Sequence, residues 1–167
     1  MPRMNRASLP LALSLLLAAA QAFAQSAGTD FFSVTFPNGW KIERDTNGSL
    51  VATPAGANHD RSISVDSCNR LARSDCPKSC EEGELRENFF YFFVGQSSAT
   101  YSKQSRPDGF ESFHASGVLG NPATWVVASV LCGAKGIVYI GSTSTISRTD
   151  AAGLLERVLS SIRWQEQ

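Results

Sequence analysis

A mostly apolar stretch near the end of the chain constrains the fold more than any other feature. Residues 124–145 read TWVVASVLCGAKGIVYIGSTST, with two apolar segments, 125–131 and 137–144, around a Gly-Ala-Lys-Gly bend. This is the pattern of a β-hairpin. Because both faces of these segments are apolar, we expect central strands of a sheet that is covered on each side.

Two helices are expected to provide that cover. The C-terminal segment follows a cap at Ser147 or Thr149 and has an apolar stripe at helical spacing. The stripe consists of Ala151, Leu154, Leu155, Val158, Leu159 and Ile162. An aromatic helix is expected over residues 81–94, where Ser79 and Glu82 fit a capping box. Its apolar face would contain Leu85, Phe89, Phe92 and Phe93.

Further strands follow from alternation of apolar and polar residues. The segments are 31–36, 40–44, 49–53, 62–66 and, more weakly, 110–116. Asn47-Gly48 predicts a hairpin turn between the second and third of them. The polar segments 69–78 and 96–108 are expected to be irregular. The predicted fold is a single α+β domain, a central antiparallel sheet flanked by helices and closed by a C-terminal amphipathic helix.

The first 24 residues have the features of a cleaved signal peptide. Arg3 and Arg6 precede an apolar run, and Ala22-Phe23-Ala24 fits a cleavage site before Gln25. Residues 25–167 then form the mature domain, and they contain no stretch of about 20 apolar residues that could span a bilayer. We expect export to the periplasm, with secretion to the extracellular space as the alternative.

The balance of charge excludes one class of partner. The chain has 15 basic and 15 acidic residues, and cleavage of the signal peptide would remove two of the arginines. Nucleic-acid binding needs a surplus of Lys and Arg, so no nucleic-acid partner is expected.

The four cysteines are Cys68, Cys76, Cys80 and Cys132. An even number in an exported chain predicts two disulfides, and three connectivities are open. Our working hypothesis joins Cys68 to Cys132 and Cys76 to Cys80, because an antiparallel pairing of 62–66 with 137–144 brings Cys68 to the hairpin bend. Metal binding is disfavoured, since the spacing lacks paired CxxC motifs.

No catalytic constellation is evident. The chain has no G-x-S-x-G, HExxH or phosphate-binding glycine motif. His59 and His114 are the candidate bases, and each is interpreted as a surface or structural histidine. We therefore expect no enzymatic activity, no cofactor and no metal site.

The start of the chain resembles PsbP-like and DcrB-like domains. Phe32, Val34, Pro37 and Trp40 match their F-x-V-x-x-P-x-x-W pattern in order. Ile63-Ser64-Val65, GNPATWVVASV and LLERVLSSIRW also look like family positions, so the resemblance spans residues 31–164. It implies a central antiparallel sheet with helices on its faces and no catalytic motif. The four cysteines, and the cysteine-rich insertion before the middle helix, depart from the common pattern.

The segment 68–87 and the neighbouring aromatic helix are the predicted binding region. We expect a non-enzymatic accessory protein that contacts a protein partner there, an immunity protein against a toxin being one specific form. The candidate contact residues are Arg73, Lys78, Glu84, Phe90 and Tyr91. The alternative is a carrier of a small molecule or lipid, with a pocket between the aromatic helix and the sheet.

Overall fold

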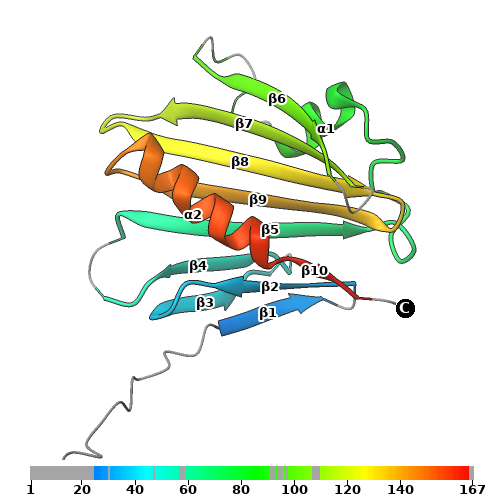
Figure 1. The fold of residues 1–167 in the computed structure, drawn as a ribbon, viewed down its shortest axis with the longest axis horizontal. Helices are drawn as coiled ribbons and strands as arrows, with labels where there is room; N and C mark the ends of the chain where they lie inside the picture. Colours follow the sequence, from blue (N-terminus) through cyan, green and yellow to red (C-terminus); the bar gives the residue numbers. More distant parts are fainter. Residues whose placement is uncertain are drawn as a thin grey trace, which may run out of the picture.

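The protein is built around one large antiparallel sheet (Figure 1). A computed structural model describes residues 25–29, 31–46, 48–56, 59–90, 93, 96, 98–106 and 110–165. The predicted signal peptide, residues 1–24, therefore lies outside the described residues. The strand order is β3-β4-β5-β9-β8-β7-β6. The strands are β3 (Trp40–Arg44), β4 (Leu50–Pro54), β5 (Arg61–Asn69), β6 (Thr100–Ser105), β7 (Glu111–Leu119), β8 (Thr124–Gly133) and β9 (Gly136–Ser144).

The apolar hairpin is the centre of this sheet, as predicted. Strand β9 is the middle strand, paired with β8 on one side and β5 on the other. The β3–β4 hairpin is also confirmed. Strand β6 corrects the expectation that 96–108 is irregular, because Thr100–Ser105 pairs along β7 as an edge strand.

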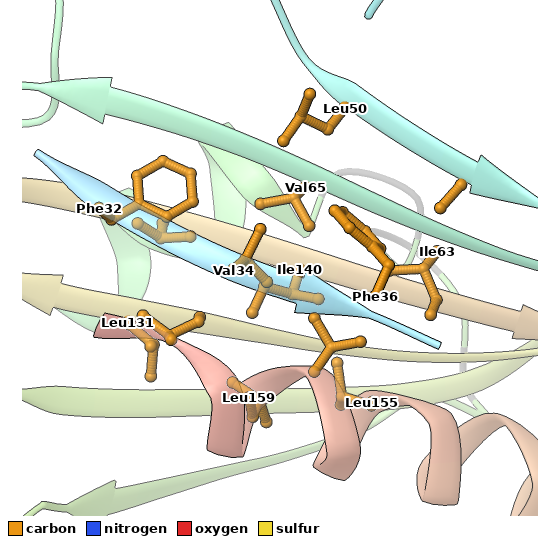
Figure 2. Close-up of a cluster of buried hydrophobic side chains, with 14 of the residues drawn as sticks. Phe32, Val34, Phe36, Leu50, Ile63, Val65, Leu131, Ile140, Leu155 and Leu159 are labelled. Atoms are coloured by element: carbon orange, nitrogen blue, oxygen red, sulfur yellow. The ribbon is translucent and has the colours of Figure 1, made fainter. Parts of the chain in front are cut away.

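The expected central antiparallel sheet is present, but it is accompanied by a second, three-stranded sheet of order β1-β2-β10, which was not predicted. The second sheet comprises β1 (Gln25–Thr29), β2 (Phe32–Phe36) and β10 (Arg163–Trp164). Strand β2 has the predicted alternation, with Phe32, Val34 and Phe36 buried. Those side chains pack onto the face of the large sheet, as Figure 2 shows, so β2 forms part of a covering layer.

Helix α2 (Arg148–Ser161) lies beside β2 on the same face of the large sheet (Figure 1). Ser147 is its N-cap and its hydroxyl accepts from the Asp150 N–H at 3.1 Å, as one of the two predicted caps. Every residue of the predicted apolar stripe is buried. Leu155 and Leu159 of this stripe join Ile140 and Leu131 of the sheet in one core (Figure 2).

Helix α1 (Glu82–Phe89) lies on the opposite face and is shorter than predicted. The predicted capping box is absent, since Glu81 is the N-cap and makes no side-chain cap bond. Glu84 reaches back instead, and its carboxylate accepts from the Ser79 hydroxyl at 2.6 Å and from the Ser79 and Lys78 N–H groups at 3.2 Å. A second core under α1 includes Leu85, Phe90, Phe93, Phe113, Val130, Ile137 and Tyr139.

Within the described parts of the chain, neither helix is long and apolar enough to cross a membrane.

Candidate functional site

Two disulfides fix the segment between β5 and α1. They join Cys68 to Cys76, with Cα atoms 5.6 Å apart, and Cys80 to Cys132, with Cα atoms 5.8 Å apart. The number of disulfides is as predicted, but the hypothesised connectivity is wrong.

The sheet register explains the error. Strand β5 does run antiparallel to β9, as assumed, and Cys68 lies opposite Ile137. Cys132 also lies opposite Ile137, but on the other side of β9. Two strand spacings of about 4.8 Å separate the two cysteines, which exceeds the roughly 7 Å Cα–Cα limit of a disulfide. Cys68 and Cys132 therefore each pair with a cysteine of the segment between β5 and α1.

Arg70 fills the interior of this segment, residues 69–80, which we call the stapled loop. Its guanidinium donates to the carbonyl oxygens of Pro77 at 2.8 Å, Gly133 at 2.7 Å and Ser79 at 2.9 Å. The Arg70 N–H also donates to the Lys135 carbonyl at 3.1 Å. One side chain thus joins both arms of the loop to the β8–β9 bend.

The outer surface of the stapled loop carries an exposed leucine. Across the described residues, the exposed large apolar residues are Leu71, which is 71% exposed to solvent, and Ile146, which is 54% exposed. Arg73 forms an ion pair with Asp75 at 2.6 Å, and both side chains are more than half exposed. Lys78 is exposed as well.

The predicted contact residues thus separate into different environments. Arg73 and Lys78 lie on the surface of the stapled loop. Glu84 is half-buried and accepts hydrogen bonds from the loop backbone, which is a structural role. Phe90 is only 1% exposed, so its side chain cannot contact a partner directly. The rings of Tyr101 and Tyr139 pack against it, with ring centroids 6.1 and 6.3 Å from that of Phe90. Tyr91 lies outside the described residues.

Sequence reasoning missed Arg70 and Leu71. Arg70 was indistinguishable from a surface arginine, because its oxygen partners are backbone carbonyls of segments that come together only in the folded chain. Leu71 had a usable signal, since it is the one large apolar residue between Cys68 and Cys76.

A group of metal-binding residue types lies where β5 meets this loop. Ligand atoms of Cys68, Asp75 and Cys76 fall within 4.8 Å of one another. Because a disulfide joins Cys68 to Cys76, their sulfurs are not available as thiolate ligands.

A polar cleft of about 300 Å³ lies on the α2 side, between that helix and strands β6 to β8. His114 lines it, and its Nε2 lies 3.2 Å from the Ser112 hydroxyl. Burial lowers the pKa of His114 and so favours the neutral imidazole, against an opposing effect of nearby Glu156. The Ser112 hydroxyl is within bonding distance of the Gln104 carbonyl at 3.3 Å, and its residue is 2% exposed. This serine is therefore held in the sheet and is not presented to the cleft as a nucleophile.

Comparison with known proteins identifies the fold. No protein-family model matches the chain, and no curated protein matches it. Among solved structures, PsbP of the cyanobacterium Synechocystis sp. PCC 6803 superposes with a TM-score of 0.62 at 16% identity, over 93% of this chain and 99% of that one. The Saccharomyces cerevisiae Ran-binding protein Mog1p gives a TM-score of 0.51 at 11% identity, over 84% of this chain and 95% of that one. A point mutant of Mog1 gives 0.52 at 10% identity, over the same shares.

The chain therefore has the PsbP-like fold, as the opening motif implied. Identities this low establish the fold alone. The disulfides add that the protein suits an oxidising, extracytoplasmic compartment.

Proposed function

We propose that the protein is an exported, non-enzymatic binding protein whose stapled loop docks a protein partner. The observation that carries this proposal is the exposure of Leu71 on a loop fixed by two disulfides and by Arg70. A large apolar side chain that a rigid loop holds in solvent can enter a pocket of a partner without rearrangement of the loop.

Rigidity is what makes the loop suitable. A loop that is already ordered loses little conformational entropy on binding, so more of its contact energy appears as affinity. Leu71 would enter an apolar pocket of the partner, with Arg73, Asp75 and Lys78 at the polar rim. One structure of the same fold is that of a Ran-binding protein, which supports protein binding by analogy of fold only.

The location and the specific role are part of this proposal. Residues 1–24 direct export, and the periplasm is the proposed compartment. Immunity against a secreted toxin is one form of partner binding that these features fit. Lipid carriage has less support, because Leu85, Phe90 and Phe93 fill the space between α1 and the sheet.

The test is a pull-down from envelope extract with residues 25–167 as bait, comparing wild type with Leu71→Asp. Ile146→Asp is the matched control, since Ile146 is also exposed and follows the end of β9 opposite the stapled loop. We expect wild type and Ile146→Asp to retain one partner at equal yield and Leu71→Asp to lose it.

Two results would contradict the proposal. One is recovery of the same partner with Leu71→Asp at the wild-type yield. The other is recovery of no partner by any bait when circular dichroism shows that all three are folded.

A further inference from the structure

A small groove beside α1 has a composition that the proposed function does not use. Its volume is about 190 Å³. It lies on the α1 side of the large sheet, where Asp66 and Tyr139 are cross-strand neighbours. The lining residues are Asp45, Ser49, Val51, Ser64, Asp66, Asn88, Phe89 and Tyr139.

Two aromatic rings form its apolar part. Phe89 at the end of α1 stacks on Tyr139 of β9, with ring centroids 6.1 Å apart and an angle of 20° between the rings. Tyr139 is 7% exposed, whereas Phe89 is half-buried and leaves part of its ring open. An aromatic ring face carries partial negative charge, so it attracts cations.

Two carboxylates form its charged part. Asp45 follows β3 and accepts from the Ser49 N–H at 2.9 Å, which fixes it in the hairpin turn. Asp66 of β5 accepts from the Ser67 N–H at 2.7 Å, which orients its carboxylate. The described lining contains no basic side chain. Both the rings and the acids therefore favour a positive ligand and disfavour an anion.

The size of the groove limits the ligand. Pockets for drug-sized molecules hold about 300–1,000 Å³, so this one suits a single small group and not a lipid. We propose that the groove binds an alkylammonium cation, with its ammonium group against the Phe89 ring and beside Asp66 and Asp45. The cation would be a free small amine or the lysine side chain of a peptide, since both present the same group.

The first test is an NMR titration of ¹⁵N-labelled residues 25–167 with n-butylammonium, using 1-butanol as the uncharged probe of similar shape. We expect saturable shifts at groove amides such as Asp66 and Phe89 with butylammonium and much weaker ones with butanol. High salt should weaken binding, because the carboxylates are accessible to solvent.

Variants locate the site. Asp66→Asn should weaken butylammonium binding by about fivefold, the scale of one partly exposed ion pair. Phe89→Leu should also weaken it, by removing the ring face. Glu156→Gln removes a carboxylate near His114 in the cleft on the α2 side and should leave binding unchanged.

A lysine peptide separates the two sources of the cation. Tighter binding of acetyl-Gly-Lys-Gly-amide than of butylammonium would assign the groove to a peptide side chain, and the reverse order to a free amine. Equal binding of butanol and butylammonium, or wild-type affinity in a folded Asp66→Asn, would overturn the proposal. Leu71→Asp should bind butylammonium normally, so failure here is distinguishable from failure of the stapled-loop proposal.

Discussion

Arg70 illustrates how one side chain can order a loop that has no regular secondary structure. Its planar guanidinium reaches three carbonyl oxygens at once, two from the stapled loop and one from the end of β8. Lysine has a single ammonium and cannot match that geometry.

Arg70→Lys should therefore lower the free energy of unfolding by roughly 1–3 kcal/mol, since it leaves half-buried carbonyls without a donor. Urea unfolding of oxidised residues 25–167, followed by circular dichroism, measures the change. Arg73→Lys is the control, because Arg73 is exposed and forms a surface ion pair with Asp75, and its effect should stay within about 0.5 kcal/mol. Equal stability of the two variants would contradict this role of Arg70.

Asp150 connects the start of α2 to two strands of the large sheet. Its carboxylate accepts two hydrogen bonds from Arg61, at 2.6 and 2.9 Å, and one from the Ser144 hydroxyl at 2.8 Å. The hydrogen bond from Arg61, more than any other contact, holds the pKa of Asp150 below its usual value.

That lowered pKa predicts a dependence of stability on pH. The unfolded chain takes up the Asp150 proton at a higher pH than the folded protein does, so the stabilisation is complete at neutral pH. It is lost as the pH falls from about 5 through the lowered pKa. Asp150→Asn should be less stable than wild type at pH 7, and the difference should shrink towards pH 2. Thermal unfolding of both proteins from pH 7 to pH 2 measures this, and a constant difference would contradict it.

The two disulfides should contribute unequally at the level of secondary-structure elements. Cys68–Cys76 closes a sequence separation of 8 residues within one loop, whereas Cys80–Cys132 closes 52 and joins the α1 region to β8. The loss of chain entropy in the unfolded state gives a stabilisation of about 2.5 kcal/mol for the short loop and about 4 kcal/mol for the long one.

The Cys80→Ser/Cys132→Ser variant should therefore unfold at a lower urea concentration than Cys68→Ser/Cys76→Ser. The two double variants are matched in chemistry, because each replaces one disulfide with two serines. The reverse order of midpoints would show that the short disulfide stabilises the native loop by more than its effect on the unfolded chain.

The elements that were predictable from sequence are those with a strong period and a buried face. The apolar stripe of α2 was evident, its cap was narrowed to Ser147 or Thr149, and the central strands β8 and β9 were evident as well. Strand β6 was missed because, at the sheet edge, its side chains are mostly exposed and its sequence TYSKQS is polar. Its pairing with β7 depends on backbone hydrogen bonds, which leave little trace in side-chain composition.

The candidate site was predictable in place but not in detail. The cysteines marked residues 68–87 as a constrained segment, and the two disulfides tie down residues 68–80 of it. The pairing of the cysteines depends on β9 lying between β5 and β8, which is a long-range property. The burial of Phe90 depends likewise on Tyr101 of the unpredicted strand β6.

At the scale of the whole molecule, the large sheet has two unlike covering layers. One combines β2 with the 14-residue helix α2 and buries a core that includes Phe32, Phe36, Leu155 and Leu159 (Figure 2). Alternation in β2 predicted that one face is buried, but it could not tell whether that face belongs to the large sheet or to a layer across from it. The second sheet was unpredictable for this reason.

The other layer depends more heavily on its disulfides. Helix α1 has eight residues, and helices shorter than about 12–15 residues are marginal without external support. That support comes from the aromatic core and from the Cys80–Cys132 disulfide directly before the helix. Regions that depend on few contacts open with smaller free energies than the rest of a domain.

Reduction should therefore open the α1 layer before the α2 layer. In native-state hydrogen exchange of residues 25–167 with reductant, below the thermal transition, amides such as Leu85 and Phe90 should lose protection. Both donate to backbone carbonyls in or next to α1 in the oxidised protein. Amides of α2 and β9 should keep most of their protection, and the Cys80→Ser/Cys132→Ser variant should reproduce this pattern without reductant. Equal loss of protection in both layers would mean that the two cores unfold as one cooperative unit, with the disulfides stabilising the whole sheet.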